Sequence, residues 1–190
     1  YEETYSARLE EFLSQTGVKA RVINFGVDAT NTRQHFALMN ARILAFKPDV
    51  ILLGYFMNDI EPRSFENLPG PAKFFMRHFH LGVFLSQRIV QTIRNRREPS
   101  RYEVDLNPKT QRASVCGGYV LETLQAYQTE KWSEPAAWIR RMKDLCRENG
   151  ILFGVILFPF EPQIRGICPL EAQSRIEVFL NQAGINFLDI

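Results

Sequence analysis

The sequence PDVILLGYFMND, residues 48–59, decides the fold. Its centre, residues 50–53, is an apolar and partly β-branched run, which is typical of a strand buried on both faces of a parallel sheet. Gly54 allows a close approach of the backbone, and polar chemistry begins only at Asn58 and Asp59. Open α/β sheets bind ligands at the carboxyl ends of their strands, so we expect these two side chains to lie at a functional site.

Segments with helix and strand patterns alternate on both sides of this strand. In chain order we predict helix 1–13, strand 19–26, helix 33–46, helix 134–149, strand 151–158, helix 169–183 and strand 185–190. Thr32 can cap the second of these helices. The alternation predicts a doubly wound α/β fold with four parallel strands, because right-handed crossovers keep such strands parallel. Their carboxyl ends should form one rim that contains Gly26, Asn58, Phe158 and Asp189.

Residues 60–133 interrupt this alternation with repeated proline and glycine. We predict that they form a helical insertion, or cap, within a single domain of residues 1–190. Helices are expected at 72–97 and 119–129. The aromatic and basic stretch 74–97 has three interpretations: a helix packed on the sheet, a lid over an acyl pocket, or a helix that contacts a membrane surface.

Composition narrows the class of protein. The chain has 190 residues, of which 45% are hydrophobic, and a formal net charge of +2. One globular domain is expected at this size, and so weak a charge does not predict a nucleic-acid partner. The longest apolar run, residues 50–57, is far shorter than the about 20 residues that span a bilayer. We expect a soluble domain, either cytoplasmic or exported to the periplasm.

The cysteines and histidines do not predict a cofactor. Cys116, Cys146 and Cys168 are widely spaced, so we expect buried free thiols rather than a zinc site or a disulfide framework. His78 and His80 lie two apart in a predicted helix and therefore point in different directions. We predict neither a metal nor an organic cofactor.

Gly26 and Asn58 end two strands of the predicted sheet and offer different hydrogen-bond donors. One is an unobstructed backbone amide, and the other is a neutral side-chain amide with two hydrogens. Two such donors aimed at one point would stabilise an oxyanion, at about 3 kcal/mol for each donor of a preorganised site. The alternative is that Gly26 only permits a turn and that Asn58 only caps a loop.

Two sequence blocks resemble those of the SGNH (GDSL-type) hydrolases. Asn-Phe-Gly-Val at 24–27 resembles the second block of that family, and Lys-Pro-Asp followed by Gly-x-x-x-Asn-Asp at 47–59 resembles the third. The resemblance is good over residues 1–59 and looser over 134–190. It implies a flavodoxin-like sheet and an enzyme that hydrolyses esters, or transfers acyl groups, on lipids, carbohydrates or small molecules. It also implies that Gly26 and Asn58 form the oxyanion hole.

Three further residues near these blocks are weaker site candidates. Asp59 follows the Asn in many members of the family and is expected to support the loop rather than to react. Asp28 and Arg33 flank the loop after Gly26. They could contact substrate, although a local ion pair or a solvated charge is the simpler interpretation.

The blocks that would carry the nucleophile and the base of this family are absent from residues 1–190. No Gly-Asp-Ser occurs, and no histidine stands three residues after an aspartate. We therefore expect the chain to be the middle of a longer serine ester hydrolase, with the serine and the histidine outside it. One alternative is an O-acetyltransferase or deacetylase of a polysaccharide. Another is a non-catalytic flavodoxin-like binding or scaffold domain.

Overall fold

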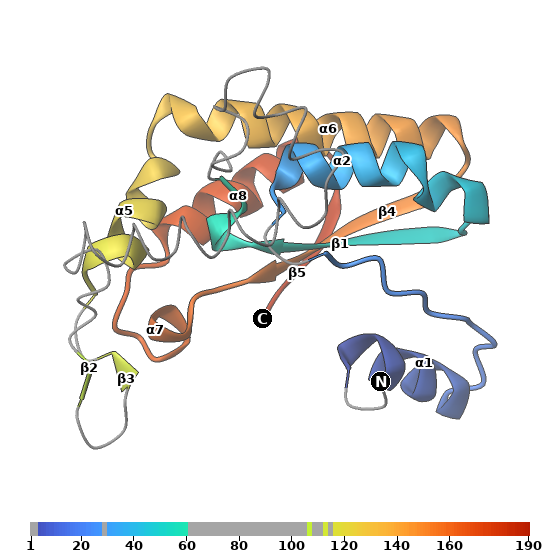
Figure 1. Cartoon of the computed structure of the whole chain (residues 1–190), viewed down its shortest axis with the longest axis horizontal. Helices are drawn as coiled ribbons and strands as arrows, with labels where there is room; N and C mark the ends of the chain where they lie inside the picture. The colour runs from blue at the N-terminus through green and yellow to red at the C-terminus, as the bar shows by residue number, and fades with distance from the viewer. Residues whose placement is uncertain (1–3, 28–29, 61–105, 108–111, 114–115) are drawn as a thin grey trace, which may run out of the picture.

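The computed structural model describes residues 4–27, 30–60, 106–107, 112–113 and 116–190 (Figure 1). Its helices are α1 (Tyr5–Gln15), α2 (Thr32–Ala41), α5 (Gly118–Ala126), α6 (Ser133–Glu148), α7 (Glu161–Ile164) and α8 (Glu171–Gln182), with short 3-10 turns η1 (Ile43–Phe46), η2 (Met57–Ile60) and η4 (Glu130–Trp132). Its strands are β1 (Val50–Phe56), β2 (Leu106–Asn107), β3 (Arg112–Ala113), β4 (Leu152–Phe158) and β5 (Asn186–Asp189).

Three of the predicted strands form one parallel sheet in the order β1-β4-β5. The register pairs Val50 with Leu152 and Phe56 with Phe158, so β1 and β4 begin and end together. β5 pairs with the second half of β4. The chain therefore has an α/β fold, and the carboxyl ends of the three strands lie at one edge of the sheet, as predicted. In the described part of the insertion, β2 and β3 form a separate antiparallel pair.

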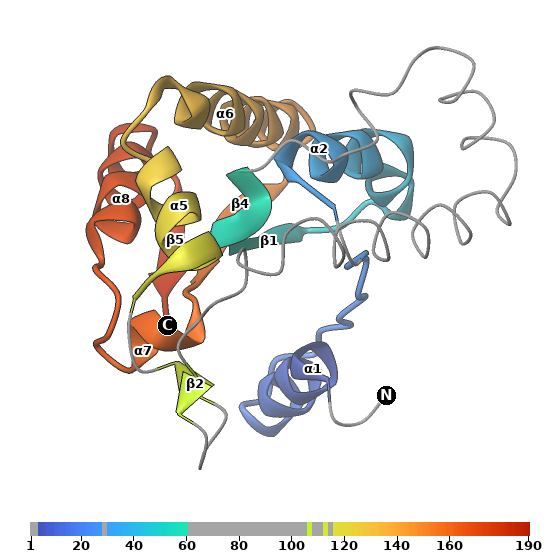
Figure 2. The ribbon, with the colours of Figure 1, turned by 60° about the vertical axis from the view of Figure 1, so that its left-hand side comes forward.

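The helices α2, α6 and α8 lie on one side of this sheet, and α1 lies on the other (Figures 1 and 2). The core forms between the sheet and the three helices, where Tyr55, Leu157, Ile139, Ile176 and Leu180 are fully buried. Ile176 and Leu180 lie four positions apart, so that they share one face of α8. Burial of these apolar side chains is the main term that holds the strands and the helices together.

The opposite face of the sheet is partly exposed, most of all at the start of β1 and β4. Val50 and Leu52 of β1 are each about half exposed, and Leu152 of β4 is 69% exposed. The only ring contact of this face with α1 joins Tyr5 to Phe158, at a centroid distance of 6.3 Å, within the described residues. The prediction that β1 is buried on both faces is therefore wrong, because three helices cover one face and α1 scarcely touches the other.

Residues 19–26 do not form the predicted strand. Residues 18–27 run without regular structure from α1 to α2, across the edge of the sheet. Their backbone donors are bound by side chains instead: the Val22 amide donates to Glu10 Oε2 (2.5 Å) and the Gly26 amide to Asn24 Oδ1 (2.8 Å). A strand exists only through pairing with a neighbour, and no described strand pairs with this segment.

The helix predicted at 33–46 is divided and begins at a different cap. Asn31, not Thr32, is the N-cap of α2, and it forms a reciprocal capping box with Gln34. The α-helix ends at Ala41 and continues as the 3-10 turn η1, after which Lys47 takes a left-handed conformation. These differences move helix boundaries and leave the order of elements unchanged.

Some predictions fall on residues outside the described ranges. They include the helix at 72–97, the three interpretations of 74–97, and the pair His78 and His80. The insertion at 60–133 and its inclusion in one domain stay predictions, whereas α5 confirms the short helix expected at 119–129. In the part of the chain that the structure describes, no helix has the length and apolar character needed to cross a membrane.

The cysteine prediction is wrong for two of the three residues. Cys116 and Cys168 form a disulfide that joins the start of α5 to the loop between α7 and α8. Cys146 is the buried free thiol that was expected, and burial raises its pKa to about 11. The sequence could not predict the bond, because its two residues are 52 positions apart and meet only through tertiary folding.

Candidate functional site

The candidate site is the turn η2 at the carboxyl end of β1. After Phe56 the chain tightens at once into this single 3-10 turn. Met57 and Ile60 point into the core, with exposures of 0% and 6%, and so the turn is anchored on both sides of Asn58. Asn58 itself is half-buried. The turn therefore presents one polar side chain at the rim of the sheet.

Asp59 holds this turn in shape. Its carboxylate oxygen Oδ2 accepts a hydrogen bond from the Phe56 amide at 3.0 Å. Its own carbonyl accepts one from Thr32 Oγ1 at 3.1 Å, which joins the first residue of α2 to the turn. Asp59 is 6% exposed; its contact with Thr32 is buried, and its contact with Phe56 is partly buried. These contacts support the turn, and both the role in the site that the resemblance implies for Asp59 and a contact with substrate stay predictions.

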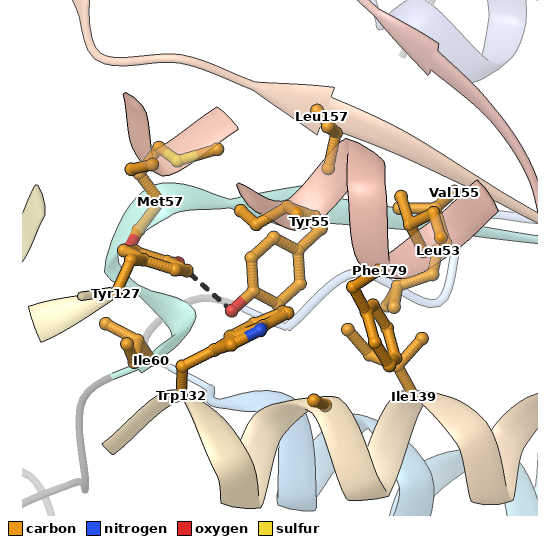
Figure 3. Packing of buried hydrophobic residues seen from close by; sticks show 14 of the residues in the cluster. Leu53, Tyr55, Met57, Ile60, Tyr127, Trp132, Ile139, Val155, Leu157 and Phe179 are labelled. Atoms are coloured by element: carbon orange, nitrogen blue, oxygen red, sulfur yellow. Dashed lines mark hydrogen bonds between the residues drawn. The ribbon is translucent and has the colours of Figure 1, made fainter. Parts of the chain in front are cut away.

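A second anchor of the turn comes from the chain beyond α5 (Figure 3). The Tyr127 hydroxyl lies 2.7 Å from the Met57 carbonyl oxygen and 3.0 Å from the Tyr55 hydroxyl. Both tyrosines have 0% exposure, and Trp132 packs on each of their rings. Burial raises the pKa of Tyr55 far above its ordinary value, the contact with Tyr127 lowers it in part, and the Asp59 charge raises it further. Tyr55 therefore remains neutral.

The Asn58 amide is available to a ligand. Among the described residues, no group forms a hydrogen bond with its side chain, whereas its two neighbours Met57 and Asp59 are both engaged. A primary amide carries two hydrogens and no charge. At a half-buried position it can donate to an anionic or carbonyl oxygen without first breaking a contact within the protein.

Gly26 is placed differently. It is exposed, it lies outside the sheet, and its amide donates to Asn24 Oδ1. The link between its loop and the Asn58 turn is indirect and runs through Thr32, which follows the loop and bonds to Asp59. Arg33 is exposed in the first turn of α2, and Asp28 lies outside the described residues. The structure thus brings Asn58 and Asp59 together at the rim, while Gly26 remains apart from the sheet.

Aromatic side chains that the sequence analysis did not identify lie beside the turn. Phe160, just after β4, packs edge-on against Phe56 at a centroid distance of 5.3 Å and contacts Tyr119 at 6.4 Å. The disulfide ties together the two segments that carry Phe160 and Tyr119. No local pattern could have revealed this cluster or Tyr127, because their partners lie far away in the sequence.

Two other kinds of site were sought among the described residues: a metal-binding cluster and a surface hollow. These residues contain no group of three or more His, Cys, Asp or Glu that could hold a metal ion. A surface hollow lies between α6 and α8, where Trp132, Arg140, Arg175 and Phe179 are among its lining residues. None of the η2 residues lines it. Comparisons with protein-family models, with curated proteins and with solved structures found no match.

Proposed function

We propose that this chain is part of an SGNH-type serine ester hydrolase with a doubly wound, flavodoxin-like sheet. Asn58 donates from its side-chain amide to the oxyanion of the reaction. The observation that carries the proposal is the half-buried amide of Asn58 at the carboxyl end of β1, which forms no hydrogen bond with a described residue. It lies on a turn that contacts of Thr32, Asp59 and Tyr127 hold in place. Preorganised donors of this kind are the main source of electrostatic stabilisation in acyl transfer.

The reaction proceeds by nucleophilic substitution at an ester carbonyl. A serine outside residues 1–190 gives its proton to a histidine, also outside them, and attacks the carbonyl carbon, so that an electron pair moves onto the carbonyl oxygen. Asn58 stabilises this oxyanion. The pair then returns, the alcohol leaves with the proton from the histidine, and water hydrolyses the acyl-enzyme by the same sequence of steps.

Gly26 is the second donor in this proposal. Its amide must first exchange Asn24 for the substrate oxygen. Among the described strands β1 is the edge of the sheet, since only β4 pairs with it, and this edge is where the proposal places a further strand. In a flavodoxin-like order that strand lies between β1 and the segment that ends at Gly26. Pairing on both sides would draw that segment into the sheet and toward Asn58.

A second candidate function is acyl transfer to, or removal of acetyl groups from, an exported polysaccharide. The observation that favours it is the disulfide between Cys116 and Cys168, since such bonds form and persist mainly in oxidising compartments. Hydrolysis and transfer share the oxyanion and differ only in the acceptor. Mass spectrometry of a partly acetylated polysaccharide after incubation with the enzyme and an activated acetyl ester as donor separates them: a gain in acetyl groups on the polysaccharide indicates transfer from the donor, and a loss indicates hydrolysis.

The proposal is tested by replacing the donor in the full-length protein. Asn58→Ala should lower kcat for a short-chain ester by about 10² or more, because one oxyanion donor is lost. The matched control is Asn40→Ala, the same change at an exposed position of α2, which should leave kcat unchanged. An unchanged rate in Asn58→Ala would remove Asn58 from the mechanism. A full-length sequence without the serine and histidine blocks would favour the binding or scaffold domain.

A further inference from the structure

We propose that Tyr127 is a positioning residue that orients Asn58 through the peptide bond between Met57 and Asn58. This inference rests on the proposed function and extends it to a residue outside both sequence blocks of the resemblance. Tyr127 follows α5 and lies 70 positions from Met57 in the chain. It nevertheless donates a hydrogen bond of 2.7 Å to the turn.

The direction of the hydrogen bonds follows from simple accounting. The Tyr127 hydroxyl has one hydrogen and lies within hydrogen-bond distance of two oxygens, the Met57 carbonyl and the Tyr55 hydroxyl. A carbonyl can only accept, whereas a hydroxyl can also donate. Tyr127 therefore donates to Met57 and accepts from Tyr55. All three groups are buried, and each would lose free energy if left without a partner.

The Met57 carbonyl is part of the same planar peptide unit as the Asn58 amide nitrogen. A hydrogen bond that fixes the carbonyl therefore fixes the plane from which the Asn58 Cα projects. The Asp59 contact with Phe56 and the Thr32 contact with Asp59 hold the two flanks of the turn. Tyr127 holds the peptide immediately before the donor, and small displacements of a catalytic group are costly in rate.

The tyrosine is itself held rigidly. Its ring lies against Trp132 at a centroid distance of 5.3 Å, and Trp132 packs edge-on against Phe179 of α8 at 5.5 Å. Figure 3 shows Tyr127, Tyr55 and Trp132 gathered beneath the turn that contains Met57. The Tyr127 hydroxyl therefore connects the peptide before Asn58 to side chains that pack on α8.

Tyr55→Phe provides a matched control for Tyr127→Phe. Both changes remove one buried hydroxyl from the same pair, but only Tyr127→Phe removes the donor to the Met57 carbonyl. We expect kcat of the full-length enzyme on a short-chain ester to fall about tenfold in Tyr127→Phe, with KM within about twofold. In Tyr55→Phe both constants should stay within about twofold. Circular dichroism establishes that each variant is folded at the assay temperature.

A double-mutant cycle separates positioning from a merely structural role. If Tyr127 acts through Asn58, then Tyr127→Phe should change kcat by less than about twofold in the Asn58→Ala background. Independent effects that multiply would overturn the inference, as would equal losses in the two tyrosine variants or a Tyr127→Phe protein that does not fold. An Asn58→Ala enzyme with unchanged kcat would instead overturn the proposed function itself.

Discussion

The turn at residues 57–60 and the segment at residues 18–27 each carry one of the two proposed oxyanion donors, and the structure holds them very differently. The turn follows a strand paired within a sheet and is fastened by hydrogen bonds from Thr32 and Tyr127, both remote in sequence. The segment has no strand partner among the described residues, and Gly26 bonds only to Asn24, two positions away. In this structure, the donor that is held in place is the one whose turn receives hydrogen bonds from residues remote in sequence.

The strongest test of this contrast is to loosen the element that carries Tyr127. Replacing both Cys116 and Cys168 by serine removes the cross-link at the start of α5, and we expect the free energy of unfolding to fall by about 2–4 kcal/mol. Denaturant unfolding with and without a reductant measures the effect. Reductant should destabilise the wild type and leave the double variant unchanged. Equal sensitivity of the two proteins would show that the bond does not form.

Asp59 tests the turn directly. Asp59→Ala removes the acceptor of the part-buried Phe56 amide, so we expect a loss of about 1 kcal/mol in the free energy of unfolding. Asp59→Asn is the control, because it keeps a side-chain carbonyl that can accept the same hydrogen bond. Chemical denaturation of both variants gives the comparison. A loss in Asp59→Asn as large as in Asp59→Ala would mean that charge, not the acceptor, holds the turn.

A substitution in the segment at residues 18–27 should affect stability much less than a substitution in the turn. Asn24→Ala removes one exposed hydrogen bond, and we expect the free energy of unfolding to change by less than about 0.5 kcal/mol. It also releases the Gly26 amide, so kcat for a short-chain ester should stay the same or rise. Steady-state kinetics of the full-length protein decides this. A fall in kcat would show that Asn24 has a direct function of its own.

At the carboxyl end of β5, the carboxyl groups of Asp189 and of Glu177 from α8 interact unfavourably when both are charged. Burial raises the pKa of Glu177, and the charge of Asp189 and its hydrogen bond act in the same direction. The folded state therefore binds this proton more tightly, and the corresponding stability is lost as pH rises through the raised pKa. Glu177→Gln should stabilise the protein at pH 7 by well under 1 kcal/mol, because Glu177 is partly exposed.

Thermal unfolding at two pH values checks the sign of this effect. Below the ordinary pKa of 4.5, Glu177 is protonated in both states, and the variant and the wild type should unfold at the same temperature. A stabilisation in Glu177→Gln that persists unchanged into acid would arise from packing rather than from the interaction with Asp189.

The sequence was sufficient to predict the elements whose signals are local. The apolar runs of β1 and β4, the periodic faces of α6 and α8, and the glycines after those helices all lie within a few residues of the structure they specify. The position of Asn58 at a strand end followed from the same pattern. Residues 19–26 carry an equally strand-like pattern and failed, since a strand also needs a partner that the pattern cannot supply.

By itself, the sequence determined the α/β class, the helices and strands from α6 to β5 apart from the short α7, and the placement of a polar turn after β1. Only the tertiary structure decided that Cys116 pairs with Cys168, that one face of the sheet stays open, and that Tyr127 reaches Met57. Hydrophobic periodicity is set by neighbours along the chain, so it can be recognised in the sequence. Disulfides, buried hydroxyl contacts and sheet edges depend on residues that are far apart in sequence and meet only in the folded state.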